Sequence, residues 1–254
     1  VLLSIHKDIG FLNEPKAMWH VILPSEDVSG GYNTHQAKYR LDESDVDNGV
    51  VKRAQHIYGA YSRVVRCARI VDKYPELSYR VPFVKGIFPD AKFVFLVRNG
   101  WETCSSIAAW SGRHRKKVGD ETHDWWGVNQ KKWHNLIEQV IETDRYFSDN
   151  ISEIRKFTRQ EDMAAVEWVA TMRECLRLKQ RYGDALHVIK YEDIVDATDE
   201  SLGRLLSYCE LADDKNFYKY ANSTLRSTTP HQRVELNPAI KSLFNETLKD
   251  MGYE

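Results

Sequence analysis

The chain has 254 residues, of which 42% are hydrophobic and 29% charged, enough for one soluble domain with a core of its own. Its 36 basic and 37 acidic residues nearly cancel, so composition points to no nucleic-acid or membrane partner, although a local cluster of cations suffices for one anionic nucleotide. No apolar run approaches a membrane span, and no signal peptide is visible. The four cysteines are scattered without metal-ligand spacing, which favours a reduced, cytoplasmic setting and no metal site.

The first part of the chain is poor in regular patterns. Residues 1–6 read as the end of an apolar helix. Glu14 precedes Pro15, and a residue before proline is sterically biased toward extended backbone. An extended carboxylate beside a nucleotide site could act as a base, although a surface glutamate in a loop is the commoner case. Residues 19–48 are polar and rich in turn formers, so they predict mostly loop.

The rest of the chain alternates short apolar runs with helical patterns. Helices are expected at 49–67, 101–110, 130–142, 150–159, 161–181 and 199–211. Buried strands are expected at 68–71, 92–97 and 185–189. This alternation predicts an α/β fold, with a parallel sheet that has helices on both faces.

Residues 88–106, FPDAKFVFLVRNGWETCSS, predict a strand, a tight turn and a helix. Arg98 stands at the strand end, and Ser106 lies eight residues later, inside the helix. In α/β sheets, ligands bind at the carboxyl ends of strands, where helix N-termini offer N–H groups to anions. Arg98 and Ser106 could therefore share one phosphate. The alternative is an arginine paired with a carboxylate and a serine packed for its small size.

Two further strand ends carry polar side chains. Lys73 follows the run 68–71 and could stabilise charge on a transferring group, as cations do in phosphoryl transfer. The alternative is a surface pair with Asp72, which contributes little energy. Tyr191 follows the run 185–189 and is a donor-site candidate or simply a half-buried tyrosine.

Residues 111–160 combine polar, basic and aromatic sequence, and we expect a helical and loop region that serves as a lid or lies on the acceptor side. Its tryptophans either stack on an acceptor or pack the helices of this region against the rest of the domain, and the structural role is favoured. The basic run 113–117 is usually a solvated face. Residues 224–234, TLRSTTPHQRV, combine arginines and hydroxyls in a composition suited to wrapping an anion. A plain solvent loop is the alternative.

Taken in order, these segments resemble the sulfotransferases that use 3′-phosphoadenosine-5′-phosphosulfate (PAPS), of the bacterial and tyrosylprotein-like type. The resemblance rests on five segments: Asn13-Glu14-Pro15, Asp72-Lys73-Tyr74-Pro75, the FPDAKF strand with Arg98 and Ser106, Tyr191-Glu192-Asp193, and Arg226-Ser227-Thr228. It implies a P-loop-type fold in a single sulfotransferase domain over residues 1–254. It also implies PAPS as co-substrate, 3′-phosphoadenosine-5′-phosphate (PAP) as product, and a small-molecule or carbohydrate hydroxyl as acceptor.

The resemblance also implies roles for individual residues. The catalytic group would be Glu14 as general base, with Lys73 and Ser227 stabilising the developing charge. The nucleotide would be held by Arg98, Ser106, Tyr191, Arg226 and Thr228. Leu77 departs from the pattern, since many relatives carry asparagine there. The phosphate loop of the family has no counterpart here, because Ser29-Gly30-Gly31 follows no strand, and we expect that loop upstream of Val1.

Two other classes stay open from the sequence. A P-loop kinase would share the architecture but would need a Gly-Lys-Ser/Thr loop and a magnesium-holding aspartate. A non-catalytic nucleotide-binding protein would retain the binding residues without the reaction.

Overall fold

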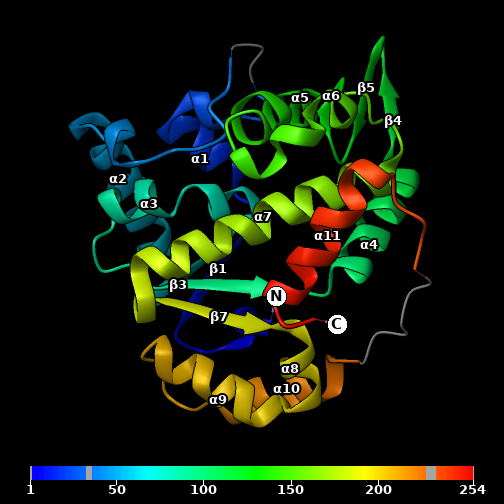
Figure 1. Cartoon of the computed structure of the whole chain (residues 1–254). Helices are drawn as coiled ribbons and strands as arrows, with labels where there is room; N and C mark the ends of the chain where they lie inside the picture. The colour runs from blue at the N-terminus through cyan, green and yellow to red at the C-terminus, as the bar shows by residue number, and fades with distance from the viewer. Residues whose placement is uncertain (1, 33–35, 227–232, 254) are drawn as a thin grey trace. The chain divides into compact units, whose positions relative to one another are not determined.

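The computed structural model describes residues 2–32, 36–226 and 233–253 (Figure 1). The chain divides into two compact units, and each is described by itself. Unit 1 comprises Val1–Leu23, Leu41–Val97 and Leu178–Thr228. Unit 2 comprises Pro24–Arg40, Arg98–Arg177 and Thr229–Glu254.

Unit 1 contains two pairs of parallel strands. Strand β1 (Ile9–Asn13) pairs with β2 (Arg69–Lys73), and β3 (Phe93–Val97) pairs with β7 (Leu186–Lys190). The predicted strands at 68–71, 92–97 and 185–189 are present within two residues, whereas β1 was not predicted. Parallel strands among helices confirm the predicted α/β fold.

The helices of unit 1 surround these strands. They are α1 (Lys16–Ile22), α2 (Asn48–Val65), α3 (Val81–Ile87), α8 (Tyr191–Asp196), α9 (Thr198–Tyr208) and α10 (Lys215–Thr224), with shorter 3₁₀ turns at Leu2–Ile5, Glu43–Asp45, Pro75–Tyr79 and Gly183–Ala185. Asp47 caps the N-terminus of α2, because its side chain accepts from Val50 N at 2.7 Å. The helix buries Val50, Ala54 and Tyr58, which recur at helical spacing and form an apolar stripe.

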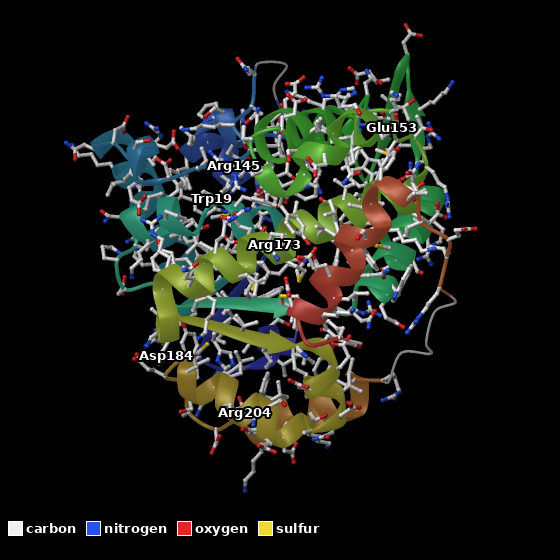
Figure 2. The ribbon with its side chains drawn as sticks, in the orientation of Figure 1. Trp19, Arg145, Glu153, Arg173, Asp184 and Arg204 are labelled. Carbon is white, nitrogen blue, oxygen red and sulfur yellow. The ribbon has the colours of Figure 1, made fainter. Side chains whose placement is uncertain are left out.

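Helix α1 lies where the sequence predicted mostly loop. This helix follows Pro15 and has only seven residues. Because it is so short, its apolar side chains are too few to give a clear helical period. Trp19 and Ile22 are nevertheless buried, and Trp19 is labelled among the side chains in Figure 2. Tertiary packing of this face, rather than local propensity, therefore makes α1 a helix.

Strand β3 is less buried than its sequence suggests. Phe95 and Val97 are buried, but Val94 and Leu96, which alternate with them, are exposed. Within the described residues, β3 pairs only with β7, so its other edge has no strand neighbour. The apolar run thus has one face in the core and one face on the surface.

Unit 2 contains most of the remaining helices. They are α4 (Gly100–His114), α5 (Lys131–Leu136) continued by a π turn (Ile137–Ile141), α6 (Ile151–Ile154), α7 (Gln160–Tyr182), which belongs to this unit up to Arg177, and α11 (Pro238–Asp250), with 3₁₀ turns at Pro24–Glu26 and Arg145–Asn150. Every helix in the described part of the chain is too short or too polar to span a bilayer. The helix expected at 150–159 shrinks to the single turn α6.

The region 111–160, expected to consist of helices and loops, also contains a small antiparallel sheet in the order β4 (Lys116–Val118), β5 (Glu121–Asp124) and β6 (Gly127–Val128). Sequence reasoning missed it because its strands are short and polar, without an apolar alternation.

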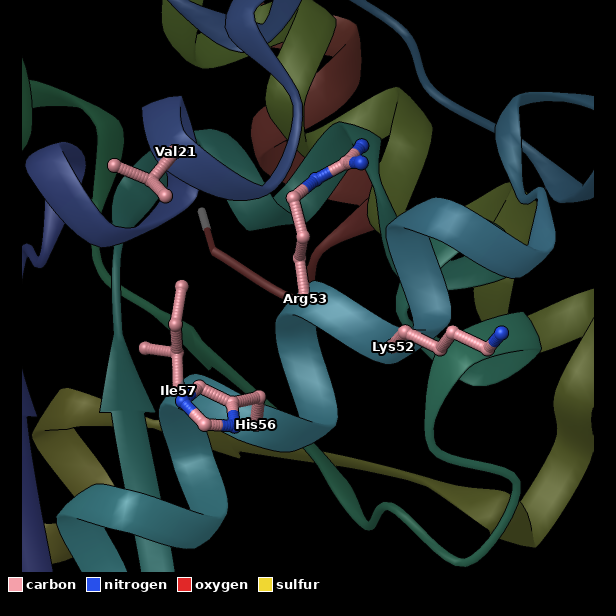
Figure 3. A pocket seen from close by; sticks show the side chains of 5 residues that line it. All are labelled: Val21, Lys52, Arg53, His56 and Ile57. Atoms are coloured by element: carbon pink, nitrogen blue, oxygen red, sulfur yellow. The ribbon is translucent and has the colours of Figure 1, made fainter.

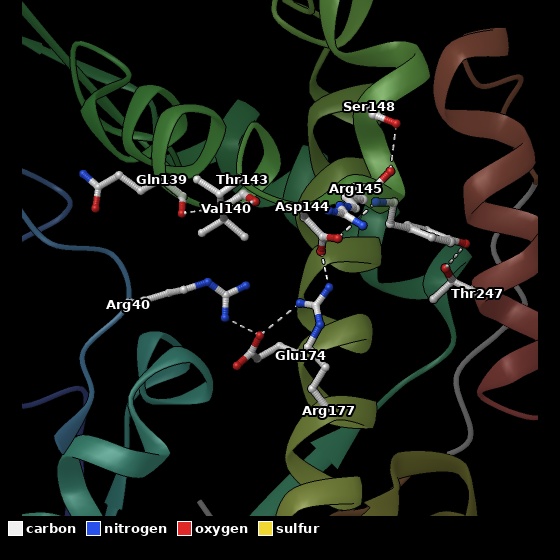
Figure 4. A network of polar contacts seen from close by, with 11 residues as sticks. Arg40, Gln139, Val140, Thr143, Asp144, Arg145, Ser148, Glu174, Arg177 and Thr247 are labelled. Carbon is white, nitrogen blue, oxygen red and sulfur yellow. Dashed lines mark hydrogen bonds and ion pairs between the residues drawn. The ribbon is translucent and has the colours of Figure 1, made fainter.

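A charged network fixes the middle of α7 in unit 2 (Figure 4). Glu174 accepts from Arg40 and, at 3.3 Å, from Arg177, which also pairs with Asp144. Glu174 is only 8% exposed. Because a buried carboxylate needs compensating donors, this cluster explains how α7 tolerates an acid on a buried face.

Gly100, the first residue of α4, lies against the core of unit 2. A Cβ at this position would be 2.6 Å from Cζ of Phe244 and 3.1 Å from Cδ2 of Trp168. Phe244 is fully buried and cannot retreat into solvent. We therefore expect Gly100→Ala to lower the free energy of unfolding by about 1–3 kcal/mol through overpacking, measured by urea denaturation.

Gly112 supplies the matched control, because it lies in the same helix and a Cβ there meets no atom within 4 Å. Gly112→Ala should raise the free energy of unfolding by about 0.5–1 kcal/mol through helix propensity. Equal effects of the two substitutions would show that close packing at Gly100 is not the cause.

Candidate active site

Glu14 and Lys73 meet at the carboxyl end of β1 and β2. The register pairs Asn13 with Lys73, so Glu14 follows directly after the last paired residue. Lys73 Nζ donates to Glu14 Oε1 at 2.5 Å, and Glu14 N donates to Lys73 O at 2.7 Å. The side chains are 46% and 36% exposed for Lys73 and Glu14, so a substrate can reach both. The structure thus brings together a carboxylate and a cation that the sequence placed 59 residues apart.

The backbone at Glu14 corrects the extended conformation expected before Pro15. Glu14 has a φ of 51°, in the left-handed region. Pro15 has φ −77° and ψ 57°, and Lys16 N donates to Glu14 O at 2.7 Å, which is an inverse γ-turn. The chain passes from β1 to α1 within these two residues, and this tight turn overrides the preference of a residue before proline.

This geometry is not explained by stability alone. An exposed ion pair contributes about 0–1 kcal/mol, whereas left-handed backbone at a residue with a Cβ costs about 1–2 kcal/mol. Backbone strain of this kind clusters at functional sites. The Glu14–Lys73 pair is therefore the strongest candidate for a reacting centre in unit 1.

Asp72 does not form the surface pair with Lys73 that the sequence left open. Adjacent residues of a strand point to opposite faces, and Asp72 faces inward. Its Oδ2 accepts from Trp19 Nε1 at 2.8 Å and from the hydroxyl of Tyr58. Sequence reasoning missed this network. The signal that could have indicated it was an aspartate directly after the apolar pair Ile70-Val71 of β2.

Burial raises the pKa of Asp72 to about 6, and hydrogen bonds from Tyr58 and Trp19 counteract that shift only in part. The pKa of an aspartate in an unfolded chain is about 3.9. The folded state therefore binds the proton more tightly than the unfolded state. The stability that this proton contributes is fully present below about pH 4 and is lost as the pH rises through about 6.

The comparison of wild type with Asp72→Asn isolates this titration. The difference in the free energy of unfolding, wild type minus variant, should increase by about 2 kcal/mol when the pH is lowered from about 7 to about 4.5. Urea denaturation at the two pH values measures it, and other titrating groups cancel because both proteins contain them. A pH-independent difference would contradict a raised pKa at Asp72.

Arg98 and Ser106 lie in unit 2, around the first turns of α4. Arg98 Nη2 donates to Glu102 Oε2 at 3.0 Å, and its carbonyl accepts from Trp168 Nε1 at 3.1 Å. Glu102 is 7% exposed, and Ser106 lies four residues further on the same helical face, exposed to solvent. Arg98 thus pairs with a carboxylate, as one alternative expected, and Ser106 lies one helical turn beyond that carboxylate. The spacing of four between Arg98 and Glu102 was the signal for their pairing.

Tyr191 and Arg226 meet in unit 1. Tyr191 is the first residue after β7, and its hydroxyl donates to the carbonyl of Arg226 at 3.4 Å. This contact links the end of a strand to the start of the predicted anion-wrapping loop. Ser227 and Thr228 lie outside the described residues.

The aromatic residues of unit 2 mostly pack inside it. Trp126 is fully buried and donates to Gln160 Oε1 at 2.7 Å, while Trp125 donates to Glu167 Oε2 at 2.6 Å. Trp110 stays 39% exposed. The structural role favoured for this region fits Trp125 and Trp126, whereas Trp110 keeps an accessible ring.

A surface hollow of about 390 Å³ lies between α1 and α2 (Figure 3). It is lined by Val21, Lys52, Arg53, His56 and Ile57. No residue of the candidate site lines it. Within the described ranges, no group of three or more His, Cys, Asp or Glu side chains is arranged to hold a metal ion.

Residues 32–155 match the model of the sulfotransferase family. That span includes Lys73, Arg98 and Ser106, whereas Glu14, Tyr191 and Arg226 lie outside it. No curated protein sequence matches the chain significantly.

Two solved structures are similar to the chain. One is described as the sulfotransferase domain from the curacin biosynthetic pathway, with 11% identity, a TM-score of 0.47 and coverage of 98% of both chains. The other is described as the sulfotransferase domain from the olefin synthase of Synechococcus PCC 7002, with 14% identity, a TM-score of 0.48 and coverage of 98% of this chain and 97% of that one. The match to the family model thus covers residues 32–155, slightly less than half of the chain, and identifies that segment as similar to the sulfotransferases.

Proposed function

We propose that this protein transfers the sulfuryl group of PAPS to a hydroxyl acceptor by in-line displacement. The observation that carries the proposal is the accessible Glu14–Lys73 pair at the carboxyl ends of β1 and β2. A base and a cation in one place suit the removal of a proton from an attacking hydroxyl and the neutralisation of charge on a leaving oxygen.

In the proposed reaction, the acceptor oxygen forms a bond to sulfur while its proton passes to the Glu14 carboxylate. The bond between sulfur and the bridging oxygen breaks, and its electron pair stays on the 5′-phosphate of PAP. Lys73 and Ser227 stabilise the charge that develops on this oxygen and on the sulfuryl group. The bound acceptor takes a position in which its hydroxyl replaces part of the Glu14–Lys73 contact.

The nucleotide is held, in this proposal, by Arg98, Ser106, Tyr191, Arg226 and Thr228. The guanidinium of Arg98 reaches α4 at Glu102, and Ser106 lies one turn further along that helix, which supports binding of the 3′-phosphate there. Glu102 Oε2 accepts from Nη2 of this guanidinium at 3.0 Å, which fixes the arginine beside the helix. The acceptor is a small molecule or a carbohydrate, and the scattered thiols support a cytoplasmic setting in a single sulfotransferase domain over residues 1–254.

The direct test follows transfer of radiolabelled sulfur from PAPS in EDTA. The acceptors are an aryl alcohol, an aliphatic alcohol, an oligosaccharide and a tyrosine peptide, and PAP release is measured in parallel. Labelled product with PAPS, and no transfer of labelled phosphate from ATP with or without Mg²⁺, is the expected result. Phosphate transfer that needs Mg²⁺ would favour a kinase, and nucleotide binding without any transfer would favour a non-catalytic binding protein.

A further inference from the structure

Asp72 joins three elements next to the Glu14–Lys73 pair. Its Oδ2 accepts hydrogen bonds from Trp19 of α1 and Tyr58 of α2, while the residue itself belongs to β2. The rings of Trp19 and Tyr58 also contact each other, with centroids 5.7 Å apart. A single carboxylate oxygen therefore fixes two helices to one strand.

The helix held through Trp19 is the one that begins next to Glu14. Only Pro15 separates Glu14 from α1, and Trp19 N donates to Pro15 O at 3.1 Å in the first turn. The direction of the Glu14 side chain depends on both flanks of its left-handed turn, namely β1 before it and α1 after it. Lys73, the partner of Glu14, follows Asp72 directly in β2.

We propose that Asp72 is a positioning residue, which holds α1 through Trp19 and α2 through Tyr58 so that the Glu14 carboxylate stays beside Lys73. The inference rests on the proposed function, in which Glu14 removes the acceptor's proton. It concerns a residue that contacts neither substrate nor the reacting atoms.

The hydrogen bonds of Asp72 and its negative charge can be tested separately. Both donors reach Oδ2, while Oδ1 is covered from solvent and has no hydrogen-bond partner among the described residues. An asparagine can place its amide oxygen where Oδ2 lies, keep both hydrogen bonds and lose the negative charge. An alanine loses both. If hydrogen bonds position α1, asparagine should substitute for aspartate and alanine should not.

Tyr58 and Tyr208 provide a matched pair of probes in unit 1. The Tyr58 hydroxyl donates to Asp72, whereas the Tyr208 hydroxyl donates to Ala185 O at 2.6 Å and to Phe93 O at 3.1 Å. Phe93 and Ala185 lie at the amino ends of β3 and β7. The hydroxyl of Tyr208 therefore binds to the start of these two strands and takes no part in the hydrogen bonds to Asp72. Each Tyr→Phe substitution removes one hydroxyl, but only one of them belongs to the proposed device.

The experiment compares kcat, the Kd for PAP and the Tm of the full chain with those of five variants: Asp72→Ala, Asp72→Asn, Trp19→Phe, Tyr58→Phe and Tyr208→Phe. We expect kcat to fall about 10-fold or more in Asp72→Ala, Trp19→Phe and Tyr58→Phe, because misplacing a reacting group by about 1 Å costs up to about 100-fold. Asp72→Asn and Tyr208→Phe should stay within about threefold of wild type, and PAP affinity should be unchanged in all five.

Hydrogen exchange of residues 14–22 gives a readout that does not depend on activity. Exchange there should increase in Asp72→Ala and stay at the wild-type level in Asp72→Asn. Unchanged exchange in the alanine variant would overturn the inference, as would equal loss of kcat in Tyr58→Phe and Tyr208→Phe. An inactive wild type whose α1 is released in Asp72→Ala would instead remove the proposed function and leave the positioning role standing.

Discussion

Substitution of Glu14 by glutamine is expected to lower kcat by about 10²–10⁴-fold while the Kd for PAP changes by less than about twofold. The amide has nearly the same shape but cannot accept the acceptor's proton. Glu14 Oε1 lies 2.5 Å from Lys73 Nζ, and in the proposed reaction the acceptor hydroxyl binds beside both groups. Steady-state turnover with PAPS, together with calorimetric titration of PAP, measures the two quantities separately.

Glu43→Gln is the matched control for this result. Glu43 is an exposed glutamate of unit 1 that pairs with Arg181 at 2.6 Å, so its substitution removes a surface ion pair far along the chain from the site. Its kcat should equal that of wild type. Turnover of Glu14→Gln at the wild-type rate would remove Glu14 as the base, even if the protein proves to be a sulfotransferase.

Substitution of Arg98 by alanine is expected to weaken PAP binding by about 10- to 100-fold, in line with about 1.5–3 kcal/mol for hydrogen bonds to a charged group. ADP, which lacks the 3′-phosphate, should bind wild type weakly and should bind the variant no worse. Isothermal titration of both nucleotides against both proteins measures the difference. Loss that is specific to PAP would assign the 3′-phosphate to Arg98.

Two further variants serve as controls for this result. Arg98→Lys keeps a cation beside the buried carboxylate of Glu102 but loses the planar fork, so it should fold normally and still bind PAP more weakly than wild type. Arg113→Ala removes an exposed arginine later in the same helix and should leave PAP affinity unchanged. An equal effect of Arg113→Ala would transfer the phosphate contact to the basic run at 113–117.

Much of the fold could be predicted because its signals are local. The stripe that buries Val50, Ala54 and Tyr58 repeats at helical period within one element, and the strand, turn and helix around Arg98 are adjacent in the chain. Helix α1 and strand β1 escaped prediction because they are short and gain their stability from tertiary contacts rather than from their own pattern.

The same distinction between local and tertiary signals applies to the candidate site. The residues at the strand ends, namely Lys73, Arg98 and Tyr191, could be identified without a structure, since a strand end is a local feature. The pairing of Glu14 with Lys73, and the inward direction of Asp72 toward Trp19 and Tyr58, became visible only in the folded chain. The register of two parallel strands makes that choice, because it joins residues far apart in the chain, and local propensity carries no information about it.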